Sequence, residues 1–309
     1  MKDVVNNYYD EIKNELINNE VYKKVKDYSK NRNELSTYYN VGKLLIEAQG
    51  GEDRAKYGDG LIKEYSLKLS QEVGKGYSTR NLKNMRKFYL LCEKGQTLSA
   101  KLNWSHYVEL LSFNDINEIN YYINTTEKYN LSVRQLREII KNKEYQRLDN
   151  NTKLKLINKE EMGIGDTIKN PIIIKNKLDI DKEDISEKIL QRLILEDIPS
   201  FLYELGEGYC FIRNEYKIKI NNTYNYIDLL LFNIKYNCYV VVELKVTEVK
   251  KEHIGQVEVY MNYIDKHVKG ITNNKTIGII VARRDNHYYI EYSSDKRIYT
   301  RDYEIVERG

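Results

Sequence analysis

The sequence predicts an α+β protein, with an all-helical, helix-turn-helix-like N-terminal domain followed by a domain with an α-β-β-β-α-β core. Three observations predict this order. Residues 1–145 show helical apolar spacing, a polar and poorly periodic stretch follows, and short β-branched runs then alternate with amphipathic helices. We therefore predict a helical domain over residues 1–150, a linker over 151–172 and a mixed domain over 173–309.

Among the helices expected in the N-terminal domain, three are delimited by clear sequence signals, and a tight turn joins the second to the third. A long helix is predicted over Tyr22–Gln49, where apolar residues recur at helical spacing. A second helix is predicted over Leu61–Val73 and ends at the glycine-rich segment 74–76. Ser78 is a good N-cap for a third helix over Thr79–Cys92. The second and third helices are therefore joined by a tight glycine turn.

The helix predicted over Thr79–Cys92 has a basic face. Residues 51–100 contain ten Lys or Arg against six Asp or Glu, and the remainder of the chain is balanced. Such a local surplus is expected of a phosphate-binding surface, although an ordinary solvated helix face would also carry charge. The side expected to be buried holds Leu82, Met85, Tyr89 and Cys92. The residues predicted to contact nucleic acid are Arg80, Lys83, Asn84 and Lys87.

The second domain is expected to contain an antiparallel meander between two helices. The first helix spans Asp184–Leu205, and Pro199 is expected to kink or restart it. The second spans Glu252–His267. The predicted strands are Tyr216–Ile220, Tyr224–Phe232, Tyr239–Val246, Thr276–Ala282, Tyr288–Tyr292 and one near the C-terminus.

Charged residues interrupt two of these otherwise apolar strands. Glu243 and Lys245 lie two residues apart and therefore point to the same face, and Asp228 can reach them from the preceding strand. Burial of unpaired charge is costly, so one interpretation is an edge strand with a wet face and a salt bridge. The other is a site. Paired carboxylates suit Mg²⁺, and an ammonium beside the ion can act on water and phosphate, which is the chemistry of phosphodiester hydrolysis.

The spacing Asp228-x(14)-Glu243-x-Lys245, followed by a helix with Gln256 and Tyr260, resembles the PD-(D/E)xK nuclease superfamily. The segments FLYELGEGYCFI, YIDLLLFN, VVVELK and GQVEVYMNYID resemble the bacterial YhcG-like proteins. The segments GYSTRNLKNMRKFY, LNWSHYVELL and LSVRQLREI resemble the N-terminal domain of the same family, which looks like a winged-helix or helix-turn-helix module. The resemblance implies a restriction-endonuclease-like fold for the second domain.

The resemblance also implies a role for each site residue. Asp228 and Glu243, with the backbone carbonyl of Leu244, would hold Mg²⁺ or Mn²⁺. Glu187, near the start of a helix, would support the metal site. Lys245 would position or activate the attacking water, and Gln256 would orient Lys245 or a phosphate. The implied enzyme is a metal-dependent endonuclease in bacterial defence or in DNA repair and processing.

Several alternatives stay open at this stage. The chain could be a catalytically silent DNA-binding protein that uses the nuclease fold as a scaffold, or it could cut RNA or branched junctions. Double-stranded DNA is the predicted partner, and cutting both of its strands with one site per chain favours a homodimer.

Composition argues against other classes of protein. No apolar run approaches the length of about 18 residues that spans a membrane, and the N-terminus lacks the apolar core of a signal peptide, so we predict a cytoplasmic protein without a membrane partner. Cys92, Cys210 and Cys238 are too few and too scattered for a disulfide framework, and the four histidines show no ligand spacing. Trp104 is expected to be a core residue.

Overall fold

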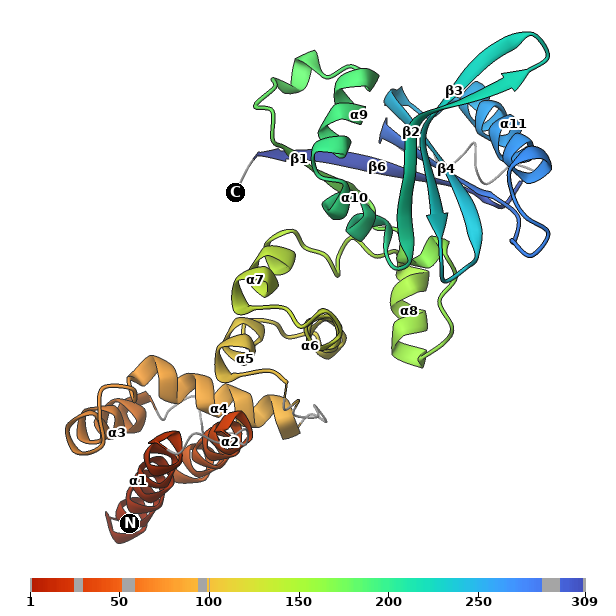
Figure 1. Ribbon diagram of the computed structural model, residues 1–309. Coiled ribbons are helices and arrows are strands. Elements are labelled where there is room, and N and C mark those ends of the chain that lie inside the picture. The colour runs from red at the N-terminus through yellow and green to blue at the C-terminus, as the bar shows by residue number, and fades with distance from the viewer. Residues whose placement is uncertain are drawn as a thin grey trace. The chain divides into compact units, whose positions relative to one another are not determined.

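The structure is a computed structural model that describes residues 2–24, 30–51, 59–93, 99, 101–284 and 295–307. The chain divides into two compact units, Met1–Lys141 and Asn142–Gly309. The first unit is helical and the second contains a mixed sheet with helices (Figure 1). The predicted α+β fold class is therefore confirmed, while the predicted domain bounds stay a prediction.

The N-terminal unit consists of helices joined by turns. They are α1 (Lys2–Lys24), α2 (Lys30–Ala48), α3 (Asp59–Glu72), α4 (Thr79–Glu93), α5 (Trp104–Leu110), α6 (Ile116–Tyr129) and α7 (Val133–Lys141). The helix predicted over Tyr22–Gln49 overlaps the end of α1 and the whole of α2, and residues 25–29 lie outside the described part of the chain. None of the described helices is long and apolar enough to cross a membrane.

Helix α4 begins where the sequence predicts, because the Ser78 hydroxyl accepts the N–H of Asn81 at 3.3 Å. It packs closely on α2: a Cβ on Gly42 would lie 2.2 Å from the Met85 carbonyl oxygen. The buried side of α4 holds Leu82, Met85, Phe88 and Leu91. Tyr89 and Cys92, predicted to be buried, are only half-buried. The buried residues recur every third position, so the buried stripe winds around the helix and leaves the predicted side.

The described strands of the C-terminal unit form one six-stranded sheet in the order β1-β6-β5-β4-β3-β2. Strands β2, β3 and β4 form the predicted antiparallel meander, whereas β4, β5, β6 and β1 pair in parallel. The strand predicted over Tyr288–Tyr292 lies outside the described residues. The bounds are β1 (Ile172–Asn176), β2 (Tyr209–Ile220), β3 (Thr223–Asn233), β4 (Cys238–Glu248), β5 (Ile277–Arg284) and β6 (Ile298–Glu307).

Helices cover both faces of the sheet (Figure 1). Helices α9 (Glu187–Glu196) and α10 (Ile198–Leu205) pack in one core with Leu229 and Val242, and α11 (Lys251–His267) packs in the other with Val241. The helix predicted over Asp184–Leu205 is thus two helices. Of the two alternatives for Pro199, the restart is the one found, since Pro199 lies in the first turn of α10 and the Asp197 carboxylate accepts the Ser200 N–H at 3.4 Å.

The predicted linker contains ordered structure that belongs to the C-terminal unit. Helix α8 (Asn150–Asn158) is followed by a 3-10 turn over Gly165–Thr167. Asp166 fixes both, because its carboxylate accepts from Lys155 Nζ and from the Gly163 N–H at 2.6 Å each, and its carbonyl accepts from Thr152 Oγ1 at 3.0 Å. Polar contacts of this kind explain why the segment is polar and yet folded.

Candidate active site

The candidate site lies where β3 and β4 part. Their antiparallel pairing runs from Asn233 and Cys238 to Leu229 and Val242, and one further step would place Asp228 opposite Glu243. Directly opposed residues of an antiparallel pair point to the same face. At this step the Leu244 N–H instead donates to Asp228 Oδ2 at 2.8 Å. The separation of the strands therefore gives Asp228 a fixed orientation beside Glu243.

Lys245 and Gln256 complete the cluster around Glu243. Lys245 Nζ lies 3.0 Å from Glu243 Oε1. Gln256, from helix α11, donates to the same oxygen at 3.1 Å and also to the Tyr260 hydroxyl at 2.9 Å. The sequence-predicted Asp228, Glu243, Lys245 and Gln256 are thus brought together by two strands and one helix.

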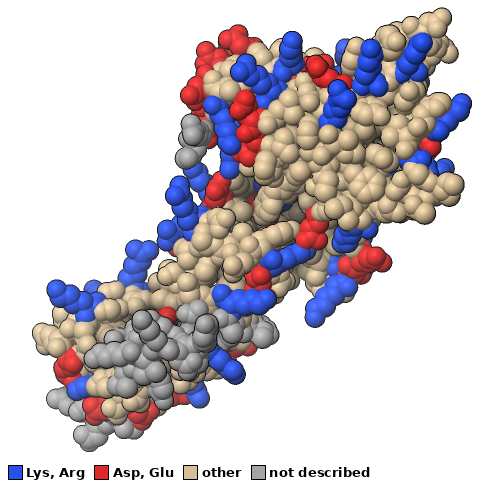
Figure 2. Space-filling view, in the orientation of Figure 1, with Lys and Arg blue, Asp and Glu red and all other residues tan. Residues whose placement is uncertain are grey.

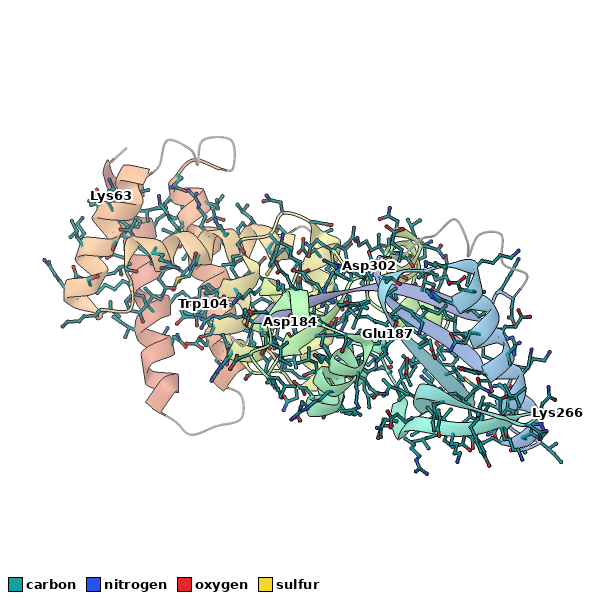
Figure 3. The ribbon with its side chains drawn as sticks, turned by 90° about the horizontal axis from the view of Figure 1, so that it is seen from above. Lys63, Trp104, Asp184, Glu187, Lys266 and Asp302 are labelled. Atoms are coloured by element: carbon teal, nitrogen blue, oxygen red, sulfur yellow. The ribbon has the colours of Figure 1, made fainter. Side chains whose placement is uncertain are left out.

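Glu187 reaches the cluster from the start of α9, where Figure 3 labels it. Its Oε2 lies 3.4 Å from Lys245 Nζ, and its side chain is 46% exposed. In this arrangement Glu187 pairs with the ammonium and lies at the solvent edge of the site. A role as a metal ligand stays a prediction.

Burial shifts the protonation of the two central carboxyl groups. Burial and then the neighbouring charge of Asp228 raise the pKa of Glu243 to about 7. Burial also raises the pKa of Asp228, against the opposing effect of the Leu244 N–H. For Lys245 burial disfavours the charged form, but Glu243, Glu187 and Asp228 outweigh it and raise its pKa. The site therefore holds the Lys245 ammonium beside the carboxyl groups of Asp228 and Glu243. Because the pKa values of both carboxyl groups are raised, a further cation is needed to favour the state in which both are ionised.

The donor set fits a hard divalent cation. Glu243 is only 3% exposed, and its Oε2 is buried and has no hydrogen-bond partner. Such an oxygen is costly unless a cation or water compensates it. No group of three or more His, Cys, Asp or Glu side chains in the described ranges is close enough to hold an ion. Two carboxylates, completed by a backbone carbonyl, water and phosphate oxygens, are an ordinary set for Mg²⁺.

Gln191 is a residue of the site that the sequence did not reveal. It lies one helical turn after Glu187 on α9, is 8% exposed, and its Nε2 donates to the Asp228 backbone carbonyl at 3.0 Å. It thus connects α9 to the strand position that carries the carboxylate. The available signal was a polar residue beside Leu190 and Leu193 on the apolar side of an amphipathic helix.

The predicted nucleic-acid-binding residues lie in the other unit. On α4, Arg80 and Lys87 are exposed, while Lys83 and Asn84 are half-buried. Lys and Arg side chains are scattered among Asp and Glu on the face seen in Figure 2. Trp104, expected to be a core residue, is only half-buried; its ring packs beside that of Tyr38, with the two centroids 4.6 Å apart.

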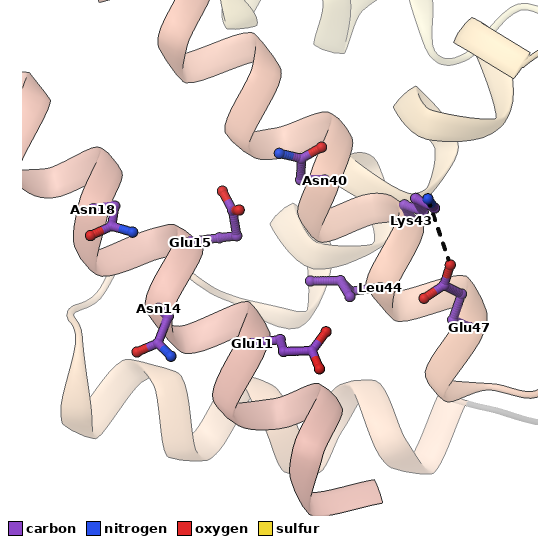
Figure 4. Close-up of a pocket in the computed structure, with 8 residues that line it drawn as sticks. All are labelled: Glu11, Asn14, Glu15, Asn18, Asn40, Lys43, Leu44 and Glu47. Carbon is purple, nitrogen blue, oxygen red and sulfur yellow. Dashed lines mark ion pairs between the residues drawn. The ribbon is translucent and has the colours of Figure 1, made fainter. Parts of the chain in front are cut away.

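A hollow of about 480 Å³ in the N-terminal unit, between α1 and α2, does not fit a nucleic acid (Figure 4). Its charged lining is Glu11, Glu15 and Glu47 with Lys43, which pairs with Glu47 at 3.9 Å. This excess of carboxylates repels phosphate.

Comparisons with known proteins give the class to which this arrangement belongs. Residues 165–307 match the family described as the YhcG PDDEXK nuclease domain, and residues 13–147 match the DUF1016 N-terminal domain. The two matches follow one another along the chain in the predicted order, so the resemblance to the YhcG-like family seen in the sequence is confirmed.

A curated relative is the Escherichia coli (strain K12) protein described as "Putative nuclease YhcG", which is 29% identical over 286 residues and matches across 80% of this chain and 76% of the relative. Among solved structures, a repair endonuclease from Pyrococcus abyssi matches with 19% identity and a TM-score of 0.28, over 40% of this chain and 49% of that chain. A likeness that low carries no weight for function.

Proposed function

We propose that this chain is a divalent-metal-dependent endonuclease that hydrolyses phosphodiester bonds, with double-stranded DNA as its main substrate. The observation that carries the proposal is the buried, unpartnered oxygen of Glu243 beside Asp228, with the Lys245 ammonium 3.0 Å from the other Glu243 oxygen. Asp228, Glu243 and the carbonyl of Leu244 would hold Mg²⁺ or Mn²⁺, which when bound polarises the phosphate and its attacking water.

The chain's own residues divide the remaining work. The raised pKa of Lys245 keeps it an ammonium at neutral pH, so it donates hydrogen bonds to water or phosphate and offsets developing negative charge. Gln256 is braced by Tyr260 and holds Glu243, which fixes the carboxylate that would face the ion. Gln191 holds the backbone of Asp228. These contacts pre-organise the site before substrate binds.

Lys245→Met is expected to reduce turnover by roughly 100-fold or more while changing metal affinity little, because the ammonium acts on water and phosphate. Single-turnover cleavage and calorimetric Mn²⁺ titration of the same preparation measure the two quantities. Lys235→Met, at an exposed position in the turn after β3, is the control. Normal turnover with weakened metal binding would instead make Lys245 a structural counter-ion of Glu243.

The basic face of α4 supports a separate binding role for the N-terminal unit. If Arg80, Lys83 and Lys87 contact phosphates, replacing all three with alanine should weaken binding to all duplex sequences about equally. The slope of log affinity against log salt should flatten by roughly 0.9 for each lost contact. Turnover at saturating substrate should persist, since the metal-holding residues belong to the other unit.

The matched control replaces three cations exposed elsewhere on the same unit, Lys101, Arg134 and Lys141. This variant has the same change in net charge. Equal salt slopes for the two triple variants would mean that α4 has only a general electrostatic effect and no phosphate contacts of its own.

The alternative functions predict different results in binding and cleavage assays. A silent DNA-binding protein would bind but cut nothing, and an RNA nuclease or junction resolvase would prefer those polymers. Incubation of the full chain with plasmid, single-stranded DNA, RNA and a four-way junction separates them. Cutting both strands of a duplex would need two sites, and each chain would supply one, so we propose a homodimer on DNA. We also propose that the enzyme acts in bacterial defence or DNA repair.

A further inference from the structure

The ends of β2 and β3 that join in a hairpin form an arm beyond the rest of the sheet (Figure 1). Strand β3 pairs with β4 only as far as Leu229, but it continues to pair with β2 out to Thr223 and Ile220. The arm is therefore the paired segment 216–220 with 223–227. It begins next to Asp228, on the side away from the β3–β4 turn.

The two faces of the arm differ in composition. One face holds Ile218 and Ile227, which are buried in the core that includes α11. The other face is exposed and pairs Lys217 with Tyr226 and Lys219 with Tyr224. We call these four residues the arm patch.

Two tyrosines and two lysines of the arm patch are arranged as a cationic aromatic surface. Tyr224 and Tyr226 are 53% and 51% exposed. Lys217 Nζ lies 3.8 Å from the ring centroid of Tyr224, and Lys219 Nζ lies 5.8 Å from it. The Lys217 ammonium thus occupies one side of the Tyr224 ring. The patch itself contains no acidic residue, and the nearest one along β2 is Glu215.

The arm patch is close to the candidate site. Tyr226 and Tyr224 lie two and four residues along β3 from Asp228, which places them about 7 and 13 Å from it at the rise of an extended strand. Glu215, whose φ of 46° is unusual inside a strand, lies across from Asp228 between the patch and the site. A nucleic acid strand with its scissile phosphate at Asp228 would have to follow β3 past Glu215 to reach the patch, which lies on the face of the arm opposite Ile227.

We propose that the arm patch binds an unpaired segment of the nucleic-acid substrate that flanks the scissile phosphate. This inference rests on the proposed nuclease function. Half-exposed tyrosine rings stack on bases, and only unpaired bases offer a free π face, since those of a duplex are stacked on each other. Lys217 and Lys219 supply charge that is complementary to the backbone phosphates of the same segment.

The binding test compares a blunt duplex with the same duplex carrying a single-stranded tail, using the full chain in EDTA so that nothing is cut. Tyr224→Ala/Tyr226→Ala should weaken binding of the tailed duplex by about 10-fold or more and leave the blunt duplex nearly unchanged. Tyr224→Phe/Tyr226→Phe keeps the rings and should bind like the wild type. Equal binding by the Ala and wild-type chains, or loss in the Phe variant equal to that in the Ala variant, overturns the proposal.

The lysines are tested by salt dependence on the tailed duplex. Lys217→Gln/Lys219→Gln should flatten the salt slope by roughly 0.7 for each lost contact with a single strand. The matched control is Lys235→Gln/Lys275→Gln, because both residues are exposed near the β3–β4 turn, on the other side of the site along β3. A slope change no larger than in this control removes the lysines from the proposal.

Failure of the arm proposal can be told from failure of the nuclease proposal. If the wild type cuts nucleic acid with Mg²⁺ but the arm variants bind the tailed duplex as it does, only the arm proposal fails. If the wild type binds the tailed duplex through the tyrosines but cuts no nucleic acid with any divalent ion, the nuclease proposal fails and the patch is a binding surface.

Discussion

Replacing Glu243 with glutamine is expected to reduce cleavage by about 1,000-fold or more while raising the melting temperature of the metal-free protein. Glutamine keeps the shape of the side chain and an oxygen that can accept from Lys245 and Gln256. It removes the negative charge that the buried position disfavours and that a cation would need. Cleavage assays and thermal unfolding in EDTA measure the two effects. A variant that loses both activity and stability would point to a structural role for Glu243.

The raised pKa of Glu243 also predicts how the folding stability of the wild-type protein depends on pH. The folded-state pKa of Glu243 is about 7, above its ordinary value. The unfolded chain therefore releases the Glu243 proton at a lower pH than the folded protein does. Folding stability should therefore fall as pH rises through the window from about 4.5 to 7, by up to roughly 3 kcal/mol from this group. Glu243→Gln should lose this part of the pH dependence, as measured by urea unfolding across that window. Parallel stability profiles for wild type and variant would contradict the raised pKa.

Arg147→Met is expected to destabilise the C-terminal unit by about 3–5 kcal/mol, because it leaves a buried charge without its main partner. Arg147 donates to Glu204 and, at 2.7 Å, to the Pro171 carbonyl. The side chains of Arg147 and Glu204 are 7% and 8% exposed. The Lys169 ammonium lies 3.8 Å from Glu204 and 3.5 Å from Glu144, and burial lowers the pKa of Lys169. Removing one member therefore affects a network that joins the segment before α8 to α10 and β1.

Urea unfolding followed by circular dichroism tests this expectation, with Arg137→Met as the control. Arg137 also pairs with a glutamate, Glu109, but its side chain is 63% exposed, so its loss should change stability little. The double variant Arg147→Met/Glu204→Leu should recover part of the loss, since no buried charge is left unpaired between these positions. Equal stability of the two Met variants would show that the buried network contributes nothing beyond a surface pair.

The sequence predicts the parts of this fold that depend on local periodicity. The alternation of side chains in β4 is enough to place Glu243 and Lys245 on one face. The short turn between β3 and β4 is enough to place the two strands side by side, with Asp228 on β3. Their burial could not be read from the pattern. It depends on packing against two helices that cover the two sides of the sheet, α9, which is distant in sequence, and α11, which follows β4 directly.

Gln191 shows where prediction from the sequence ends. Its spacing from Glu187 is visible in the sequence, but its partner is a backbone carbonyl of β3, and a backbone group gives no sequence signal. The segment 151–172 fails to reveal its structure for a related reason. Its polar side chains bond to backbone groups and to one another around Asp166, and such contacts leave no apolar periodicity.

The measurement that tests the central claim most directly is cleavage of labelled plasmid and oligonucleotide substrates by the wild-type chain, titrated with Mg²⁺ and repeated in EDTA, beside Glu243→Gln prepared in the same way. We predict cleavage that rises with Mg²⁺, stops in EDTA and is absent from the variant. Cleavage that survives EDTA, or that Glu243→Gln performs as well as the wild type, would contradict the assignment of Asp228, Glu243 and Lys245 as a metal-dependent nuclease site.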